Sequence, residues 1–117
     1  MRYMFLIYSV EAEAAPEAMQ AVSLRHRALM EETARLGVLC AADPLKPVAT
    51  ATTVRTRNGK PFTTDGPFAE TKELLAGYYI LECRDLDEAI EWARRIPTAC
   101  YGAEGCIEIR PIHEIRP

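Results

Sequence analysis

The sequence predicts an α+β domain, a ferredoxin-like split βαβ fold with an extra hairpin in its middle. Three observations predict it: two strand-like segments that are apolar on both faces, two segments with the spacing of amphipathic helices, and an Asn58-Gly59 turn between shorter strands. A strand that is apolar on both faces must be covered on both sides, and helices can cover one of them. The chain has 117 residues, the length of one domain, so we take residues 1–117 as a single unit.

The first third of the chain predicts a strand followed by a long helix. Residues 2–8 carry apolar side chains at both alternating sets of positions. Pro16 suits the first turn of a helix, and Gly37 suits the residue that caps its end. Between them runs a stripe at three- and four-residue steps, made of Met19, Val22, His26, Leu29, Met30, Thr33 and Leu36.

The middle of the chain predicts short strands and a hairpin. Residues 38–42 are a short strand candidate, and the β-branched segment 50–57 is another. Asn58-Gly59 is a strong hairpin signal, with a short return strand at 61–63. Residues 64–67 form a turn by their chemistry.

The last third predicts a second buried strand, a helix and a final strand. Residues 75–83 are apolar on both faces. Asp85 and Glu88 have the spacing of a capping box, and Pro97 stops the helix that follows. Its inward side chains are expected to be Leu86, Ala89, Ile90 and Ala93. A strand at 106–109 completes the order β-α-β-β-β-β-α-β.

Composition excludes several classes of protein and partner. Hydrophobic residues make up 49% and charged residues 26%, which excludes disordered, collagen-like and disulfide-dominated chains. The net charge of -3 favours neither nucleic acid nor a membrane surface as partner. The apolar run at residues 3–8 is short for a signal peptide, and no segment approaches the ~20 apolar residues of a membrane span, so we expect a cytoplasmic protein.

Cysteine and histidine spacing predicts no metal site. No C-x-x-C pair occurs, and the two histidines are too scattered for a zinc-finger pattern. Cys40 and Cys83 are expected as small core residues. Cys100 and Cys106 flank a Gly-rich turn and are either free thiols or a disulfide. No G-x-G-x-x-G segment or P-loop occurs, so we expect no nucleotide cofactor, and the sequence indicates no cofactor of any kind.

The predicted fold has a consequence for association. Both helices of such a fold pack on one face of the sheet, so the other face presents a large apolar patch in a monomer. That patch is either Tyr3, Phe5 and Ile7 or Met4, Leu6 and Tyr8. A second copy is the simplest cover, so the sequence predicts a homodimer whose sheets face each other.

One long segment resembles a known family. Thr63–Glu73, which is TTDGPFAETKE, and the following Leu75–Tyr79 closely resemble the signature of the DGPF family, a branch of the YCII-related proteins. Further segments resemble the same family, so that the resemblance covers essentially the whole chain: 3–8, 49–55, 86–93 with Ile96-Pro97, and 107–112.

The resemblance implies a ferredoxin-like fold assembled as a dimeric α/β barrel. It also implies a small-molecule enzyme, because a His and an Asp meet in a pocket in YCII proteins. Many DGPF proteins are encoded beside extracytoplasmic-function sigma factors. The alternative function is therefore a non-catalytic sensor of a small ligand, or an accessory partner of a sigma factor or transcription regulator.

Asp65 and His26 are the expected catalytic residues. The segment Asp65-Gly66-Pro67-Phe68 is either a purely structural turn, with Phe68 packed down, or a rigid support for the Asp65 carboxylate at a pocket rim. His26 is either a hydrogen-bonded core residue or an imidazole delivered to a cavity. Many DGPF sequences have Tyr at this place, whereas YCII proteins proper have a helix His. We take His26 and Asp65 as an acid–base pair.

Further residues are expected to bind a substrate beside this pair. Phe68, Glu70 and Lys72 belong to the DGPF segment, although a solvated charged turn explains Glu70 and Lys72 equally. Tyr78 and Tyr79 should lie on opposite faces of one strand, one toward the helices and one toward the dimer cavity. A role as an ordinary surface residue is the simpler explanation for the lesser candidates, which are Arg25, Arg27, Thr71, Glu73 and His113.

Overall fold

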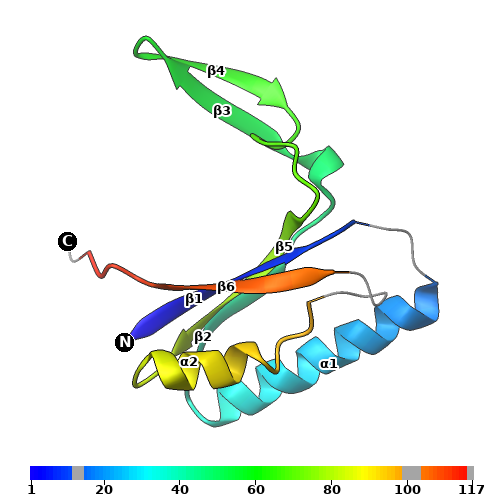
Figure 1. Ribbon diagram of the computed structural model, residues 1–117, viewed down its shortest axis with the longest axis vertical. Coiled ribbons are helices and arrows are strands. Elements are labelled where there is room, and N and C mark those ends of the chain that lie inside the picture. The colour runs from blue at the N-terminus through cyan, green and yellow to red at the C-terminus, as the bar shows by residue number, and fades with distance from the viewer. Residues whose placement is uncertain (12–14, 99–103, 116–117) are drawn as a thin grey trace.

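The computed structural model describes residues 1–11, 15–98 and 104–115 and shows an α+β fold on a four-stranded antiparallel sheet (Figure 1). The sheet contains β1 (Arg2–Ser9), β2 (Leu39–Pro44), β5 (Leu74–Glu82) and β6 (Gly105–Pro111), in the order β2-β5-β1-β6. The predicted order of elements, including the extra central hairpin, is confirmed.

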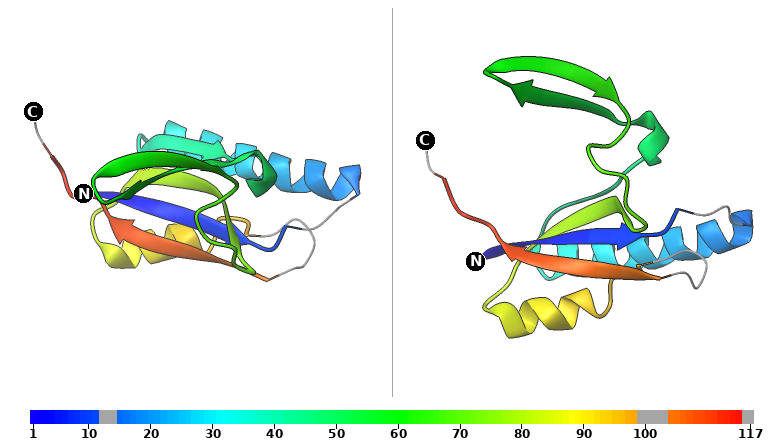
Figure 2. Two further views of the ribbon diagram at one scale, coloured as in Figure 1. Left: turned by 90° about the horizontal axis from the view of Figure 1, so that it is seen from above. Right: turned by 45° about the horizontal axis from the view of Figure 1, so that its top comes forward.

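Helices α1 (Pro16–Arg35) and α2 (Leu86–Ala93) lie on the same face of the sheet (Figures 1 and 2). α1 contacts β2 and α2 contacts β6, so each helix covers one half of the sheet. The core lies between sheet and helices and contains Tyr3, Phe5, Ile7, Leu29, Tyr79, Leu81, Cys83, Ala89 and Ile96. None of the helices in the described ranges is both long and apolar enough to cross a membrane.

The two faces of β1 now have different neighbours. Tyr3, Phe5 and Ile7 are buried against the helices. Met4, Leu6 and Tyr8 are only half-buried, because they point to the other side of the sheet. We call this side, which the helices leave uncovered, the open face.

The helix ends follow the sequence signals closely. α1 begins at Pro16 and is closed by Gly37, whose φ of 77° is the left-handed conformation expected of a capping glycine. The Asp85 carboxylate accepts a hydrogen bond of 2.9 Å from the Glu88 N–H, as an N-cap does. The Glu88 side chain does not complete a capping box, because it pairs with Arg84 at 2.7 Å.

Between β2 and β5 the chain leaves the sheet. A short helix η1 (Val48–Thr50) leads into a hairpin of β3 (Thr52–Arg57) and β4 (Lys60–Asp65), which we call the arm. Asn58 and Gly59 have φ values of 52° and 77°, as the predicted two-residue turn requires. The arm stands on the side of the sheet opposite the helices (Figures 1 and 2).

Several expectations about single residues are wrong. Cys40 is exposed rather than in the core, because it lies on the edge strand β2, at the irregularity between Leu39 and Ala41. Leu86 is 51% exposed at the first position of α2, before the helix meets the sheet. Asp65 ends β4 instead of lying in the turn, because its backbone pairs with Thr52. Cys83 is buried as predicted. Cys106 is a free thiol, the first of the two expected alternatives, and Cys100 lies outside the described residues.

Candidate functional site

The turn after β4 lies at the base of the arm. Gly66 has a φ of 91°, which favours glycine, and its N–H donates to the Ala51 carbonyl at 2.8 Å. The Thr53 hydroxyl donates to the Gly66 carbonyl at 2.7 Å. Phe68 does not pack down as expected, since it is 75% exposed, and Arg55 donates to its carbonyl at 2.6 Å. These bonds brace the base of the arm and bury no aromatic side chain.

Asp65 and Glu70 both lie at this exposed base. Asp65 is exposed at the end of β4, and Glu70 is exposed in the segment that leads to β5. In the part of the chain that the structure describes, the Asp65 carboxylate receives no side-chain or backbone hydrogen bond. Asp65 is therefore positioned by its strand, through its backbone alone.

His26 pairs with Tyr79 beneath the sheet. Its Nδ1 lies 2.8 Å from the Tyr79 hydroxyl, and the two rings are stacked with centroids 5.9 Å apart. Burial, helped by the charge of Arg25, lowers the pKa of His26 below its ordinary value. Burial raises the pKa of Tyr79 to about 12. At neutral pH the pair therefore consists of a neutral imidazole and a protonated phenol.

His26 and Asp65 do not meet within one chain. His26 contacts the helix-covered face through Tyr79, whereas Asp65 lies at the base of the arm, on the opposite side of the sheet (Figure 1). The partner of the His26 imidazole is the phenol of Tyr79. The hydrogen-bonded core interpretation of His26 fits this geometry.

Tyr78 and Tyr79 lie on opposite faces of β5, as predicted. Tyr79 is 2% exposed and belongs to the core. Tyr78 is half-buried on the open face, and its hydroxyl donates to the Asp43 carboxylate at 2.7 Å. The bond to Asp43 raises the pKa of Tyr78.

A second tyrosine–carboxylate pair lies on the open face. Tyr8 of β1 and Glu108 of β6 share this face, because Tyr8 is opposite Cys106 and Leu6 is opposite Glu108 in the register of the two strands. Burial and the charge of the neighbouring Glu108 carboxylate raise the pKa of Tyr8. Burial and the nearby Glu108 and Glu73 also raise the pKa of the Cys106 thiol.

Tyr8 also lines a surface depression of about 490 Å³ at this end of the sheet. Its other lining residues are Thr71, Lys72, Glu73 and Glu104. Lys72 forms an exposed ion pair with Glu104 at 3.4 Å, and the Thr71 hydroxyl donates to the Glu73 carbonyl at 2.6 Å. The end of the DGPF segment thus borders the depression, whereas its Asp65 and Phe68 do not.

The remaining candidates take surface positions. Arg25 and Arg27 are exposed on α1, and His113 is exposed after β6. Within the described ranges, no group of three or more His, Cys, Asp or Glu side chains could hold a metal ion.

Three residues in or beside this depression were not among the site residues predicted from the sequence: Tyr8, Glu104 and Glu108. The alternation of residues 2–8 placed Tyr8 on one of two faces, but only the strand order shows which face the helices leave uncovered. Glu108 joins Tyr8 through the register of β1 with β6, two strands far apart in the chain. A charged residue within an alternating strand was the one local signal for Glu108.

Comparison with known proteins agrees with this architecture and gives no activity. The model of the YCII-related domain matches residues 1–116. An uncharacterised protein of Rhizobium meliloti (strain 1021) is 35% identical over 120 residues, a match that covers 100% of this chain and 96% of that protein. Because the match to the domain model spans nearly every residue, the chain belongs to the YCII-related family.

Proposed function

We propose that this protein is a homodimeric enzyme that acts on a small organic molecule by proton transfer, in a site on the open face. The observation that carries the proposal is the position of Tyr8, which borders the depression on a largely apolar sheet face and has Glu108 beside it on that face. Convergent polar groups at the edge of an apolar surface are typical of small-molecule sites.

The chemistry of the pair suits acid–base work. Because its pKa is raised, Tyr8 keeps its proton at neutral pH and can donate it to a substrate oxygen or nitrogen. Glu108 lies beside the phenol on the same face, and water returns a proton to the tyrosinate that forms. Lys72 and Glu73, which also line the depression, would orient the polar end of the substrate.

The homodimer encloses this site. Met4, Leu6 and Ile80 line the open face beside the pair and are half-buried in a single chain. A second copy that covers them would form the two-sheet barrel expected for the family. Exclusion of water would then strengthen the hydrogen bonds between the polar groups and the substrate.

The proposal gives His26 and Asp65 supporting roles. His26 fixes the Tyr79 hydroxyl within the core. Asp65 closes the base of the arm through its backbone pairing with Thr52. Neither residue lines the depression in one chain, whereas Tyr8 does, so the proton-transfer role moves from His26–Asp65 to Tyr8 with its neighbour Glu108.

A thermal-shift screen against a panel of small metabolites tests the site. The variants are Tyr8→Phe, Glu108→Gln and Lys72→Met, with Asp65→Asn and His26→Gln as matched controls away from the depression. A compound that raises the Tm of the wild type should lose at least about 10-fold in affinity in Tyr8→Phe, because a polar contact is removed. The two controls should keep wild-type affinity.

The outcomes separate the alternatives. Conversion of the bound compound by the wild type, lost in Tyr8→Phe and Glu108→Gln, supports the enzyme. Binding without conversion supports a ligand sensor instead. Loss of binding in Asp65→Asn and His26→Gln alone would place the site at the His26–Asp65 pair, built across two chains, and would overturn the proposal.

A further inference from the structure

We propose that the arm of each chain crosses to the partner and lays its basic face on the acidic end of the partner's open face. The inference rests on the proposed homodimer and goes beyond it, because it assigns the arm as a part of the partner's site.

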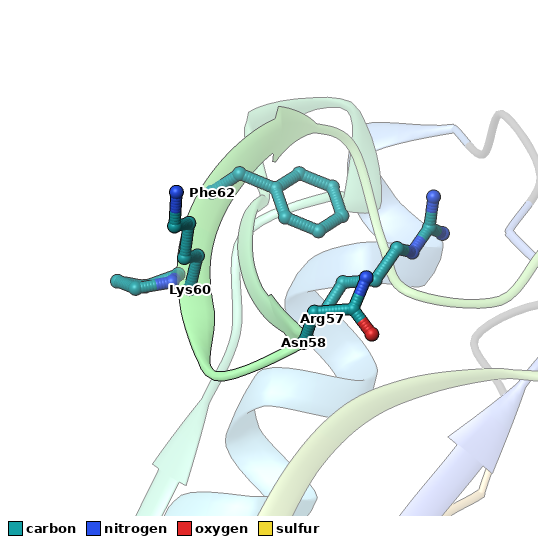
Figure 3. Close-up of a pocket in the computed structure, with 5 residues that line it drawn as sticks. Arg57, Asn58, Lys60 and Phe62 are labelled. Atoms are coloured by element: carbon teal, nitrogen blue, oxygen red, sulfur yellow. The ribbon is translucent and has the colours of Figure 1, made fainter.

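The three cations of the arm lie on one face. Arg57 is opposite Lys60 and Arg55 is opposite Phe62 in the hairpin register, and residues two apart in a strand share a face. The Arg57 guanidinium lies over the Phe62 ring, 5.3 Å from its centroid, and Figure 3 shows the two side chains next to each other. Together with Asn58 and Pro61, Arg57, Lys60 and Phe62 line a depression of about 540 Å³.

In a single chain most residues of the arm are exposed to solvent. Every residue of β3 and β4 is exposed except the half-buried Thr53 and Phe62. Among the described residues, the hydrogen bonds that leave the arm reach only Gly66 and Phe68, at its base. A lone two-stranded hairpin is at best marginally stable in water, so this one needs a surface to pack against.

The charge of the open face complements the arm. Glu73, Glu104 and Glu108 gather at the end of the sheet where β5 and β6 begin, with Lys72 paired to Glu104. The whole chain has a net charge of -3, and the arm contributes three cations and only Asp65 as an anion. The body is therefore more acidic than the whole chain, which favours approach of an arm from a second copy.

The exposed area also fits a second copy. A compact monomer of 13.1 kDa exposes roughly 6,400 Å², whereas this chain exposes 8437 Å². The radius of gyration is 16.0 Å, against about 13 Å for a compact chain of this length. Each partner of a stable dimer buries about 800 Å², so the arm and the open face together expose enough surface for one.

The partner's arm would complete the site. In one chain the depression beside Tyr8 has Glu73 and Glu104 on its wall and Lys72 as its cation. Arg57 and Lys60 from the partner would neutralise these carboxylates and cover the depression. The symmetry of a two-chain assembly makes the exchange reciprocal, so each site has one arm over it.

A charge-swap experiment tests the crossing. One variant reverses the arm, Arg57→Glu with Lys60→Glu, and another reverses the body, Glu104→Lys with Glu108→Lys. Each alone should weaken the dimer at least about 10-fold, measured by sedimentation in low salt, because like charges then meet. An equimolar mixture of the two should recover a mixed dimer of near wild-type affinity, seen by native mass spectrometry. The matched control, Arg25→Glu with Arg27→Glu on α1, should dimerise as the wild type does.

The other outcomes overturn the crossing. If the mixture stays monomeric while a chain with all four reversals dimerises, the arm contacts its own body. If the arm-reversed variant dimerises normally, the arm carries no part of the interface, although the Tyr8 site can still stand on its ligand binding. If the wild type is monomeric and its arm binds an added DNA oligonucleotide, the basic face serves nucleic acid. Loss of ligand binding in Tyr8→Phe has no bearing on these outcomes, because they are read from dimerisation or from DNA binding.

Discussion

At the scale of residues, the His26–Tyr79 pair couples folding to pH. Burial lowers the pKa of His26 in the folded chain, whereas the unfolded chain keeps the ordinary value of 6.5. As the pH falls through 6.5, the unfolded chain takes up a proton that the folded chain resists, so the free energy of unfolding decreases. We expect stability to be greater at about pH 7.5 than at about pH 5.5 by at most about 1.4 kcal/mol, because only about one pH unit of this range lies below the unfolded pKa.

Urea unfolding of two histidine variants checks this expectation. His26→Gln should be about 1 kcal/mol less stable near neutral pH, since the bond to Tyr79 changes, but its stability should vary less with pH. His113→Gln is the matched control, because His113 is exposed and is the other histidine of the chain. An unchanged pH dependence in His26→Gln would show that another group causes it.

Residue types alone could indicate which side chains are able to do chemistry, but not which of them lie in contact. His26 was recognisable as a histidine on an apolar helix stripe, and its core role was one of two open interpretations. The long DGPF segment drew attention to Asp65, yet the segment spans two places: Gly66 braces the arm, and Lys72 borders the depression. A motif that is continuous in sequence can therefore contribute residues to two separate parts of the structure.

At the scale of elements, the short helix α2 depends on its first residue. Asp85 accepts the Glu88 N–H, which otherwise lacks a partner within the helix. Asp85→Ala should cost about 1 kcal/mol, a loss of about 3–6 °C in Tm by calorimetry. Asp85→Asn should cost much less, because an amide oxygen also caps.

A neighbouring aspartate provides the control for the cap. Asp87 lies in the first turn of α2, where its charge favours the helix by only a few tenths of a kcal/mol. Equal losses in Asp85→Ala and Asp87→Ala would mean that charge, and not the hydrogen bond, stabilises the helix start.

Elements with strong local signals were predictable, and their spatial pairing was not. The bounds of β1, α1 and the Asn58-Gly59 turn follow from alternation, Pro16, Gly37 and turn chemistry. The position of Cys40 was not predictable, because it depends on an irregularity where β2 meets β5. The Tyr8–Glu108 pair likewise depends on register between strands at opposite ends of the chain. Such registers are set by tertiary packing, which has no local sequence signal.

At the scale of the whole molecule, the open face is an apolar sheet face that the helices of one chain do not cover. Met4 and Leu6 point away from the helices, and the arm rises on the same side (Figure 2). A sheet with one apolar face uncovered behaves as half of a two-sheet sandwich, whose sheets pack about 10 Å apart. The homodimer that we propose would cover this face and enclose the site.

The wild type should accordingly have twice the mass of the 13.1 kDa chain in size-exclusion chromatography with light scattering. Leu6→Glu places a charge in the middle of the open face, beside Glu108, and each dimer would contain it twice. We expect its dimer to be at least about 100-fold weaker, because an apolar contact is lost and a carboxylate is desolvated. Leu24→Glu is the matched control: Leu24 is 54% exposed on α1, across the sheet, so its dimer should be unchanged. Equal weakening in both variants would place the interface on the helices, whereas no weakening in either would leave the open face exposed to solvent.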